Sequence, residues 1–364
     1  METSITDTSR RCFEQVVRPL LEREFPQETA RTAFGLFGYG SEAYRMDDDY
    51  SRDHHWGPRL LLFLSHQDCV RVKTKIIQTL SAKLPYEFLG YSTNYGEPEP
   101  GGVRHLLKTD RGPVNHMVQI FTLKSFFEGR LGFDPSKKIS VIDWLTVPQQ
   151  KLLEAVSGEV YHDGLGNLRK IREKLKFYPR DVWLFLLAAQ WIRIAEVEAF
   201  VGRAGEVGDE LGSSLIAAHQ VNDIMKLAFL MEKQYAPYAK WFGTAFGKLR
   251  IGPTLTRVLR AVLLAKTWKA REKRLAEAYS IIARQHNALK ITRPLPTEVT
   301  KYYGRPYLVL QSHSFVSSIV EAIKDPQVRS LQTIGSVDQL IDSHELLQRL
   351  SVLRRVRVLY EPPH

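Results

Sequence analysis

Cysteine is scarce in this chain of 364 residues: Cys12 and Cys69 are its two cysteines, and neither belongs to a C-x-x-C pair. This scarcity argues against a disulfide-stapled fold and against a zinc ribbon. The first fifteen residues, METSITDTSRRCFEQ, lack the apolar core of a secretory signal. We therefore expect a cytoplasmic protein that works in a reducing compartment.

Long hydrophobic runs are also missing. The most apolar stretch, residues 182–201, is interrupted by Gln190, Arg193, Glu196 and Glu198. This pattern predicts a buried helix of a globular domain and no membrane span. The chain also lacks a P-loop lysine motif and a G-x-S-x-G elbow, which argues against P-loop NTPases and α/β-hydrolases.

The net charge of +11 is unevenly distributed along the chain. Residues 1–148 carry 19 basic and 19 acidic side chains, whereas residues 149–364 carry 32 and 21. Such an excess favours an anionic ligand, either a nucleotide or a nucleic acid, on the second part. Solvated helix faces, as in LRKIREKLK, are the structural alternative.

Hydrophobic periodicity divides the chain into two expected domains. In residues 1–148, strand-like runs at 33–37, 60–64 and 114–122 alternate with helical patterns at 11–24 and 68–83, and Pro19 marks a kink or restart in the first helix. Residues 149–364 are dominated by helical periodicity, with expected helices at 148–157, 166–176, 179–200, 206–234, 254–287 and 307–323. We therefore predict an α+β fold: a small mixed-sheet domain (1–148) followed by an all-α helical bundle (149–364).

One stretch, residues 38–64, gathers most groups that could bind a phosphate or a metal ion. The turn Gly40-Ser41 lets backbone N–H groups approach phosphate oxygens closely. Asp53 and His55 point the same way on an extended segment, so both could face one cation, and Asp49 could add an oxygen ligand. An exposed acidic loop is the alternative for residues 47–49, and an ion pair with an aspartate is the alternative for Arg52 as a phosphate ligand.

The same stretch resembles a known superfamily. Gly40-Ser41, eleven intervening residues, and Asp53-His54-His55 running into LLLFL are similar to the nucleotidyltransferase superfamily of the DNA polymerase β type. More closely, YSRDHHWGP resembles an uncharacterised family of nucleotidyltransferase-like proteins with a run near YSRDHDWGP. The likeness extends to RAGEVGDELGS, YAPYAKWFGTAF and IGSVDQLIDS, and so covers most of the chain.

Two departures from the superfamily pattern concern the metal. The second carboxylate falls at His55, and the third carboxylate is expected near residues 118–122, where the chain has Gln119. Imidazole suits Mn²⁺ or Zn²⁺ better than Mg²⁺. The resemblance implies Mg²⁺ or Mn²⁺ as cofactor and a nucleoside triphosphate, ATP by preference, as substrate, with Asp53, His55 and Asp49 as the metal ligands.

The helical part supplies further candidates. Glu206 and Glu210 are spaced to share a helix face. The chain resembles small-molecule nucleotidyltransferases, whose helical domain binds the acceptor, and this resemblance implies that either glutamate could accept a proton from an acceptor hydroxyl; acids that complement a helix N-terminus are the alternative. Lys226 and Lys240 could neutralise a triphosphate. For Lys240 the alternative is a lysine packed in an aromatic helix-end cluster.

The resemblance, together with these residues, leads us to expect a metal-dependent nucleotidyltransferase. It would move a nucleoside monophosphate to an unidentified acceptor, a small molecule in preference to protein or RNA. A catalytically degenerate nucleotide- or RNA-binding protein is the alternative, and a metal-dependent hydrolase built on residues 53–55 is a second one.

Overall fold

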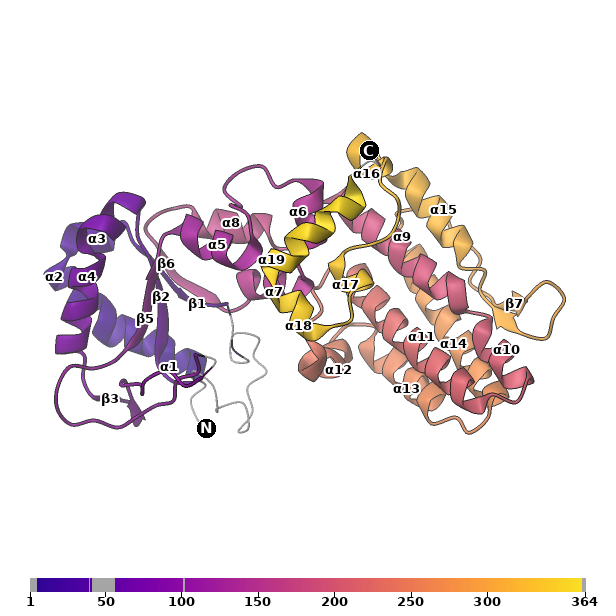
Figure 1. The fold of residues 1–364 in the computed structure, drawn as a ribbon, viewed down its shortest axis with the longest axis horizontal. Coiled ribbons are helices and arrows are strands. Elements are labelled where there is room, and N and C mark those ends of the chain that lie inside the picture. Colours follow the sequence, from indigo (N-terminus) through magenta and orange to yellow (C-terminus); the bar gives the residue numbers. More distant parts are fainter. Residues whose placement is uncertain (1–4, 39, 41–55, 101, 362–364) are drawn as a thin grey trace. The chain divides into compact units, whose positions relative to one another are not determined.

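A computed structural model describes residues 5–38, 40, 56–100 and 102–361. The chain forms two compact units, and it passes between them more than once. The first unit comprises residues 1–138 and 151–176, and the second comprises residues 139–150 and 177–364. The fold is therefore mixed α+β, with the main sheet in the first unit and a helical second unit (Figure 1).

The first unit is built on a four-stranded sheet in the order β5-β2-β1-β6. The central strands β1 (Ala33–Leu36) and β2 (Arg59–Phe63) are antiparallel, with Gly35 opposite Leu61. On the outer side of β2, the parallel strand β5 (Met117–Phe121) brings Gln119 opposite Leu61. On the outer side of β1, strand β6 (Glu159–Asp163) pairs with it in antiparallel orientation, and the register of this pairing shifts between Phe34 and Gly35. A Cβ on Gly35 would lie 2.5 Å from the Glu159 carbonyl oxygen, so this close approach requires glycine.

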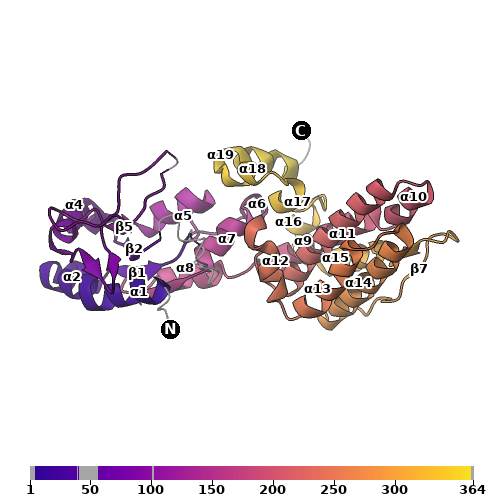
Figure 2. The ribbon, with the colours of Figure 1, turned by 90° about the horizontal axis from the view of Figure 1, so that it is seen from below.

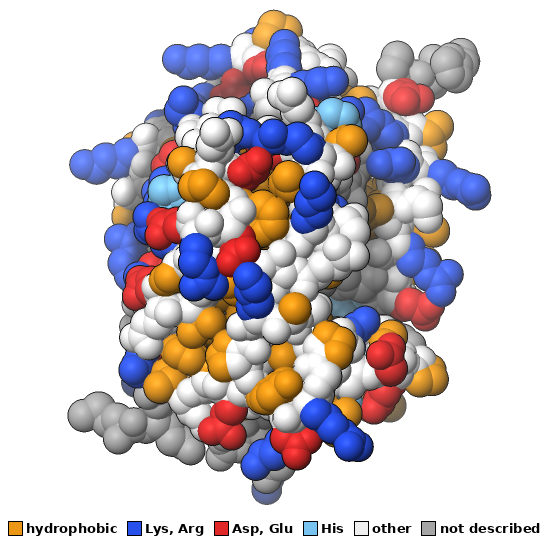
Figure 3. All heavy atoms as spheres, turned by 90° about the vertical axis from the view of Figure 1, so that its left-hand side faces the viewer, with side chains coloured by type: hydrophobic (Ala, Val, Ile, Leu, Met, Phe, Trp, Pro, Cys, Tyr) orange, Lys and Arg blue, Asp and Glu red, His pale blue; other side chains and the backbone are white. Residues whose placement is uncertain are grey.

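Alternate side chains on each strand point to opposite faces of the sheet. Both faces are covered by helices. On one face, Phe34, Leu62 and Ile120 join a core with residues of the N-terminal helices and α4 (His66–Lys83). On the other face, Phe37 and Phe63 pack against Phe126 of α5 (Leu123–Leu131). The described outer surface around α2 and α4 carries interspersed basic and acidic side chains (Figure 3).

The N-terminal helix has an irregular middle. Its segments are α1 (Ile5–Cys12), a π-helical stretch over Phe13–Val17, and α2 (Arg18–Glu24). Pro19 has no N–H, and its ring would collide with the carbonyl four residues earlier in a regular α-helix. The wider π-helical turns just before Pro19 relieve this conflict, which agrees with the restart predicted there. The remaining elements of this unit are α3 (Pro26–Ala30), β3 (Glu87–Phe88), β4 (Tyr91–Ser92), α8 (Leu168–Lys174) and most of α7 (Gln149–Val156).

The second unit is a helical bundle. Its long helices are α9 (Arg180–Val197), α11 (Glu210–Met231), α13 (Gly252–Leu263), α14 (Trp268–Ala288) and α15 (His313–Ala322). Helices α11, α13 and α14 lie side by side, as do α9 and α15 (Figures 1 and 2). Shorter elements complete it: α6 (Val141–Thr146), α10 (Phe200–Glu206), α12 (Ala239–Gly247), the hairpin β7 (Thr300–Lys301) and β8 (Leu308–Val309), α16 (Pro326–Arg329), α17 (Val337–Leu340), α18 (His344–Gln348), α19 (Leu350–Leu353) and a 3₁₀ helix over Arg354–Tyr360.

Three expected helices were wrong in extent. The one over 307–323 starts with strand β8, and its helix, α15, begins only at His313. The one over 206–234 is split, because Gly208 has φ +85° and Asp209 caps a new helix with a bond from the Gly212 N–H. The one over 254–287 is also divided, and Thr267 caps its second half. The described ranges contain no helix long and apolar enough to cross a bilayer.

Candidate functional site

The predicted phosphate and metal ligands fall mostly outside the described residues. These are Ser41, Asp49, Arg52, Asp53 and His55. The structure instead describes the two ends of the stretch that contains them, at Gly38 and Gly40 on one side and from Trp56 onward on the other.

Both ends of this stretch lie at one edge of the sheet. Strands β1 and β2 are antiparallel, so the C-terminal end of β1 is beside the N-terminal end of β2 at Arg59. The first residues of β5 and β6 are here as well, since Met117 pairs with Arg59 and Glu159 pairs with Leu36. Four chain segments therefore converge at this edge. Residues 41–55 lie in the sequence between two of them, β1 and β2.

The backbone after β1 adopts a conformation that favours glycine. Gly38 and Gly40 have φ values of +101° and +114°. The Gly38 N–H donates to the Glu154 carbonyl oxygen at 3.0 Å, which ties this turn to the end of α7. Glycine at these two alternate positions adopts positive φ without the cost that a Cβ would add, and Gly38 is buried whereas Gly40 is partly exposed.

An arginine of α5 adjoins this turn. A Cβ placed on Gly38 would lie 3.6 Å from Nε of Arg130. The Arg130 guanidinium also lies over the ring of Phe126, 3.9 Å from its centroid. Packing on the ring restricts the guanidinium to a position beside the glycine turn, where it contributes positive charge.

A second arginine packs on Phe37, the residue just before the turn. The Arg172 guanidinium carbon lies 4.5 Å from the Phe37 ring centroid. Its Nη2 donates to the carbonyl oxygens of Val156, Ser157 and Gly158 at 2.8, 3.0 and 3.2 Å. Burial lowers the pKa of Arg172 to about 10, so it stays charged at neutral pH. Arg172 thus fixes the end of α7, to which the Gly38 N–H is also bonded.

The position expected for the third carboxylate opens onto a pocket. A cavity of about 400 Å³ runs along β5 and is lined by Ile77, Gly102, Arg104, Asn115, His116, Met117, Val118 and Gln119. Arg104 Nη1 donates to Asn115 Oδ1 at 3.0 Å. Burial lowers the pKa of His116, whose Nδ1 accepts from the Val118 N–H at 3.2 Å. The lining is thus polar, with amide groups at Asn115 and Gln119.

The two glutamates predicted as bases belong to different helices, so the prediction that they share one helix face was wrong. Glu206 ends α10 and accepts a hydrogen bond from the Tyr307 hydroxyl. Glu210 begins α11 and accepts from the Trp268 N–H at 3.0 Å and from Arg271 at 3.1 Å. The Trp268 N–H bond, ahead of the Arg271 contact, lowers the pKa of Glu210. Glu206 therefore joins α10 to the residue that precedes β8, and Glu210 joins the start of α11 to the start of α14.

The two predicted lysines also lie in the second unit. Lys226 Nζ donates to the Asp338 carbonyl oxygen at 3.2 Å, and burial lowers its pKa. Lys240 Nζ lies 4.9 Å from the Trp241 ring centroid, in keeping with the aromatic cluster considered as its alternative.

Sequence reasoning missed Arg130 and Arg172. Each is separated from Gly38 by a long stretch of chain, and their proximity follows from the order of the sheet and the position of α5 and α8. No local pattern around either residue identifies it.

The comparisons with known proteins are sparse. A family model described as a domain of unknown function (DUF4037) matches residues 144–242, which run from the end of α6 into α12. The matched range does not include residues 38–64. No curated protein and no solved structure matches the chain.

Proposed function

We propose that the protein is a nucleotidyltransferase that moves a nucleoside monophosphate from a nucleoside triphosphate to an acceptor, a small molecule in preference to protein or RNA. One observation supports this most: the two ends of the stretch with Gly40, Ser41, Asp53 and His55 lie at the same sheet edge, next to Arg130. Phosphate-binding backbone and metal-binding side chains have to meet in this way for the reaction to occur.

The chain's own groups would act mainly by binding and orientation. Backbone N–H groups of the turn at Gly40 and Ser41 would bind the β- and γ-phosphates, with Arg52 and Arg130 offsetting their charge. The acceptor oxygen would attack the α-phosphorus, the bond to the bridging oxygen would break, and pyrophosphate would leave. The acceptor proton would pass to a carboxylate or to water.

Mg²⁺ or Mn²⁺, when bound, would stabilise negative charge on the phosphates. Its proposed ligands, Asp49, Asp53 and His55, lie outside the described residues. Within the described ranges there is no group of three or more His, Cys, Asp or Glu side chains that could hold an ion. Gln119 offers one neutral amide oxygen, a weak ligand for Mg²⁺.

Gln119 is also the observation that favours the alternative, a degenerate site that binds a nucleotide without transferring it. An amide cannot replace the charge of a third carboxylate. The polar pocket beside Gln119 could then hold the nucleotide's base through the amides of Asn115 and Gln119. RNA binding by such a protein would weaken steeply with added salt.

The experiment is pyrophosphate release from each nucleoside triphosphate, with Mg²⁺ or Mn²⁺ and a metabolite extract as the source of acceptor. We expect release with at least one combination, and its loss in Asp53→Asn with the thermal unfolding temperature nearly unchanged. Release by the Asp53 variant at the normal rate, or no release under any combination, would reject the transferase.

A nucleotide-binding measurement distinguishes the transferase from the degenerate site that binds a nucleotide without transferring it. Arg130→Gln should weaken nucleotide binding roughly tenfold or more, because a charge-assisted hydrogen bond contributes about 1.5–3 kcal/mol. The matched control is Arg111→Gln, which removes an exposed arginine of the same unit. Binding without pyrophosphate release would support the degenerate site.

A further inference from the structure

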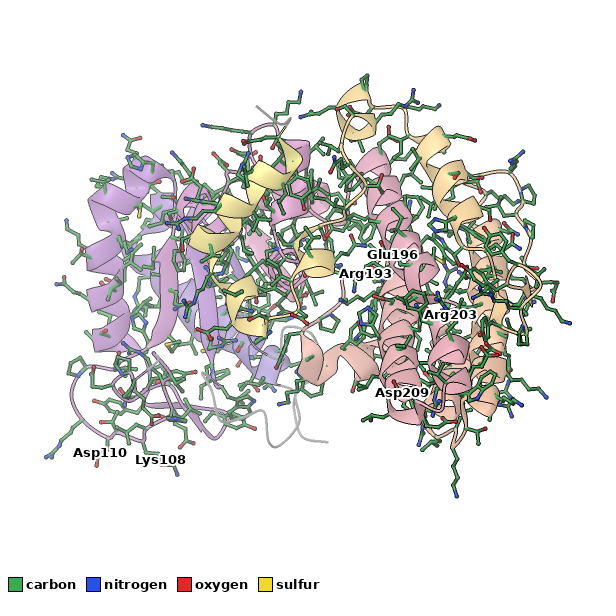
Figure 4. All side chains as sticks on the ribbon, turned by 45° about the vertical axis from the view of Figure 1, so that its right-hand side comes forward. Lys108, Asp110, Arg193, Glu196, Arg203 and Asp209 are labelled. Carbon is green, nitrogen blue, oxygen red and sulfur yellow. The ribbon has the colours of Figure 1, made fainter. Side chains whose placement is uncertain are left out.

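The helical unit contains a cluster of charged side chains that the nucleotide site does not use. Arg193 lies on α9 (Figure 4), and His219 and Asp223 lie one turn apart on α11. Asp223 is completely buried, whereas the side chains of Arg193 and His219 are 29% and 54% exposed. All three residues fall within the range matched by the family model.

The arginine is held in place from two sides. Its Nε donates to Asp223 Oδ1 at 3.0 Å, and its Nη1 donates to the Gln339 carbonyl oxygen at 2.8 Å. Asp223 Oδ1 also accepts from Gln190 Nε2 at 2.9 Å. The guanidinium is therefore preorganised, and its third nitrogen, Nη2, faces His219.

Nε2 of His219 cannot hydrogen-bond to both of its neighbours at once, because it would have to accept from Arg193 and donate to Asp223. Nε2 of His219 lies 3.1 Å from Arg193 Nη2 and also 3.1 Å from Asp223 Oδ2. If Nε2 is unprotonated it can accept from Arg193, but then Asp223 Oδ2 has no donor in the described structure. A buried oxygen without a donor costs about 1–3 kcal/mol.

When Nε2 carries a proton, it donates to Asp223 Oδ2, and this cost is avoided. The N–H of Arg193 Nη2 then meets another donor and needs a different acceptor. Nδ1 of His219 is at the same time free of the Asp223 contact. The solvent-facing side of the cluster thus has a fixed arginine N–H without a suitable acceptor beside an imidazole oriented by a buried carboxylate.

We propose that Arg193 and His219 form a binding site for an oxyanion, the phosphate or carboxylate group of a small molecule. The oxyanion would accept from Arg193 Nη2, and a second oxygen of the ligand would accept from Nδ1–H of the imidazolium form of His219, whose Nε2–H donates to Asp223. Lys226, one turn after Asp223, adds positive charge on the same helix. The proposal does not depend on the nucleotide site of the first unit.

The test uses the full chain and two probes, inorganic phosphate and acetate. Binding of each probe is measured by calorimetry and by the change in the NMR signals of the His219 imidazole. We expect at least one probe to bind and to shift these signals. The probe that binds more tightly distinguishes a phosphate site from a carboxylate site. Arg193→Gln should weaken binding about tenfold or more.

Three further variants make the result decisive. Arg203→Gln changes a neighbouring arginine that lies over the Phe200 ring and should bind within about twofold of the unaltered protein. Arg130→Gln should leave the His219 shift unchanged, which separates this site from the nucleotide site. His219→Gln is informative if Arg193→Gln fails to fold, and it should also weaken binding. No shift with either probe, or an equal loss in Arg203→Gln, would overturn the proposal.

Discussion

Desolvation shifts the pKa of single charged side chains in the second unit, and Asp338 is a clear case. Its carboxylate accepts from the Gln149 N–H at 3.0 Å. Burial raises its pKa to about 6 from 3.8. A raised carboxyl pKa means that the folded state holds its proton more tightly than the unfolded state. The associated stability is therefore present below pH 3.8 and is lost as the pH rises through 6.

Asp338→Asn should consequently stabilise the protein at neutral pH. The neutral amide keeps an acceptor for the Gln149 N–H and removes a buried charge that costs about 3 kcal/mol at pH 7.5. Urea unfolding at pH 7.5 and pH 4 should show the gain at the first pH and little of it at the second. A variant less stable than the unaltered protein at pH 7.5 would show that the Lys226 ammonium compensates the carboxylate.

The strand pairing that shapes the candidate site depends on one residue without a side chain. Gly35→Ala should lower the free energy of unfolding by about 1–3 kcal/mol, because its Cβ would collide with the Glu159 carbonyl oxygen. Gly129→Ala on α5 is the matched control, since nothing lies within 4 Å of its added Cβ. The control should be neutral or stabilising by up to about 1 kcal/mol. Equal losses in the two variants would contradict the assignment.

Elements with continuous apolar runs could be predicted from the sequence, and elements defined by their partners could not. The runs at 33–37 and 60–64 and the helical pattern at 68–83 each coincide with an observed element. Strand β6 was missed because EVYHD carries two adjacent apolar residues without clear alternation. Its strand conformation depends on pairing with β1. Gly208 likewise interrupts the segment 206–234, whose apolar pattern predicts a single helix.

The candidate site was partly predictable for the same reason. Its glycine turn and acidic stretch are local features, so their spacing is visible in the sequence. The arginines near the turn come from α5 and α8, and only the assembled sheet brings them there. The cluster of Arg193, His219 and Asp223 combines a local pair, four residues apart on α11, with a partner from α9 that no spacing reveals.

At the scale of the whole molecule, the sequence placed the domain boundary at residue 148, whereas residues 151–176 belong to the first compact unit. A fragment of residues 1–148 would lack β6 and leave one edge of β1 unpaired, which promotes aggregation. We expect residues 1–176 to be soluble and to unfold cooperatively, and residues 1–148 to aggregate or remain unfolded. Size-exclusion chromatography and thermal unfolding of the two fragments test this. Equal behaviour would show that β6 is dispensable.

The pairing of β1 with β6 has a consequence for biosynthesis. Strand β1 ends at Leu36 and β6 begins at Glu159, so the ribosome must add more than a hundred residues between them. At 5–20 residues per second this takes roughly 6–25 s. During that interval the nascent chain exposes an apolar strand edge, which makes this protein a candidate client for chaperones that bind polypeptides still in translation.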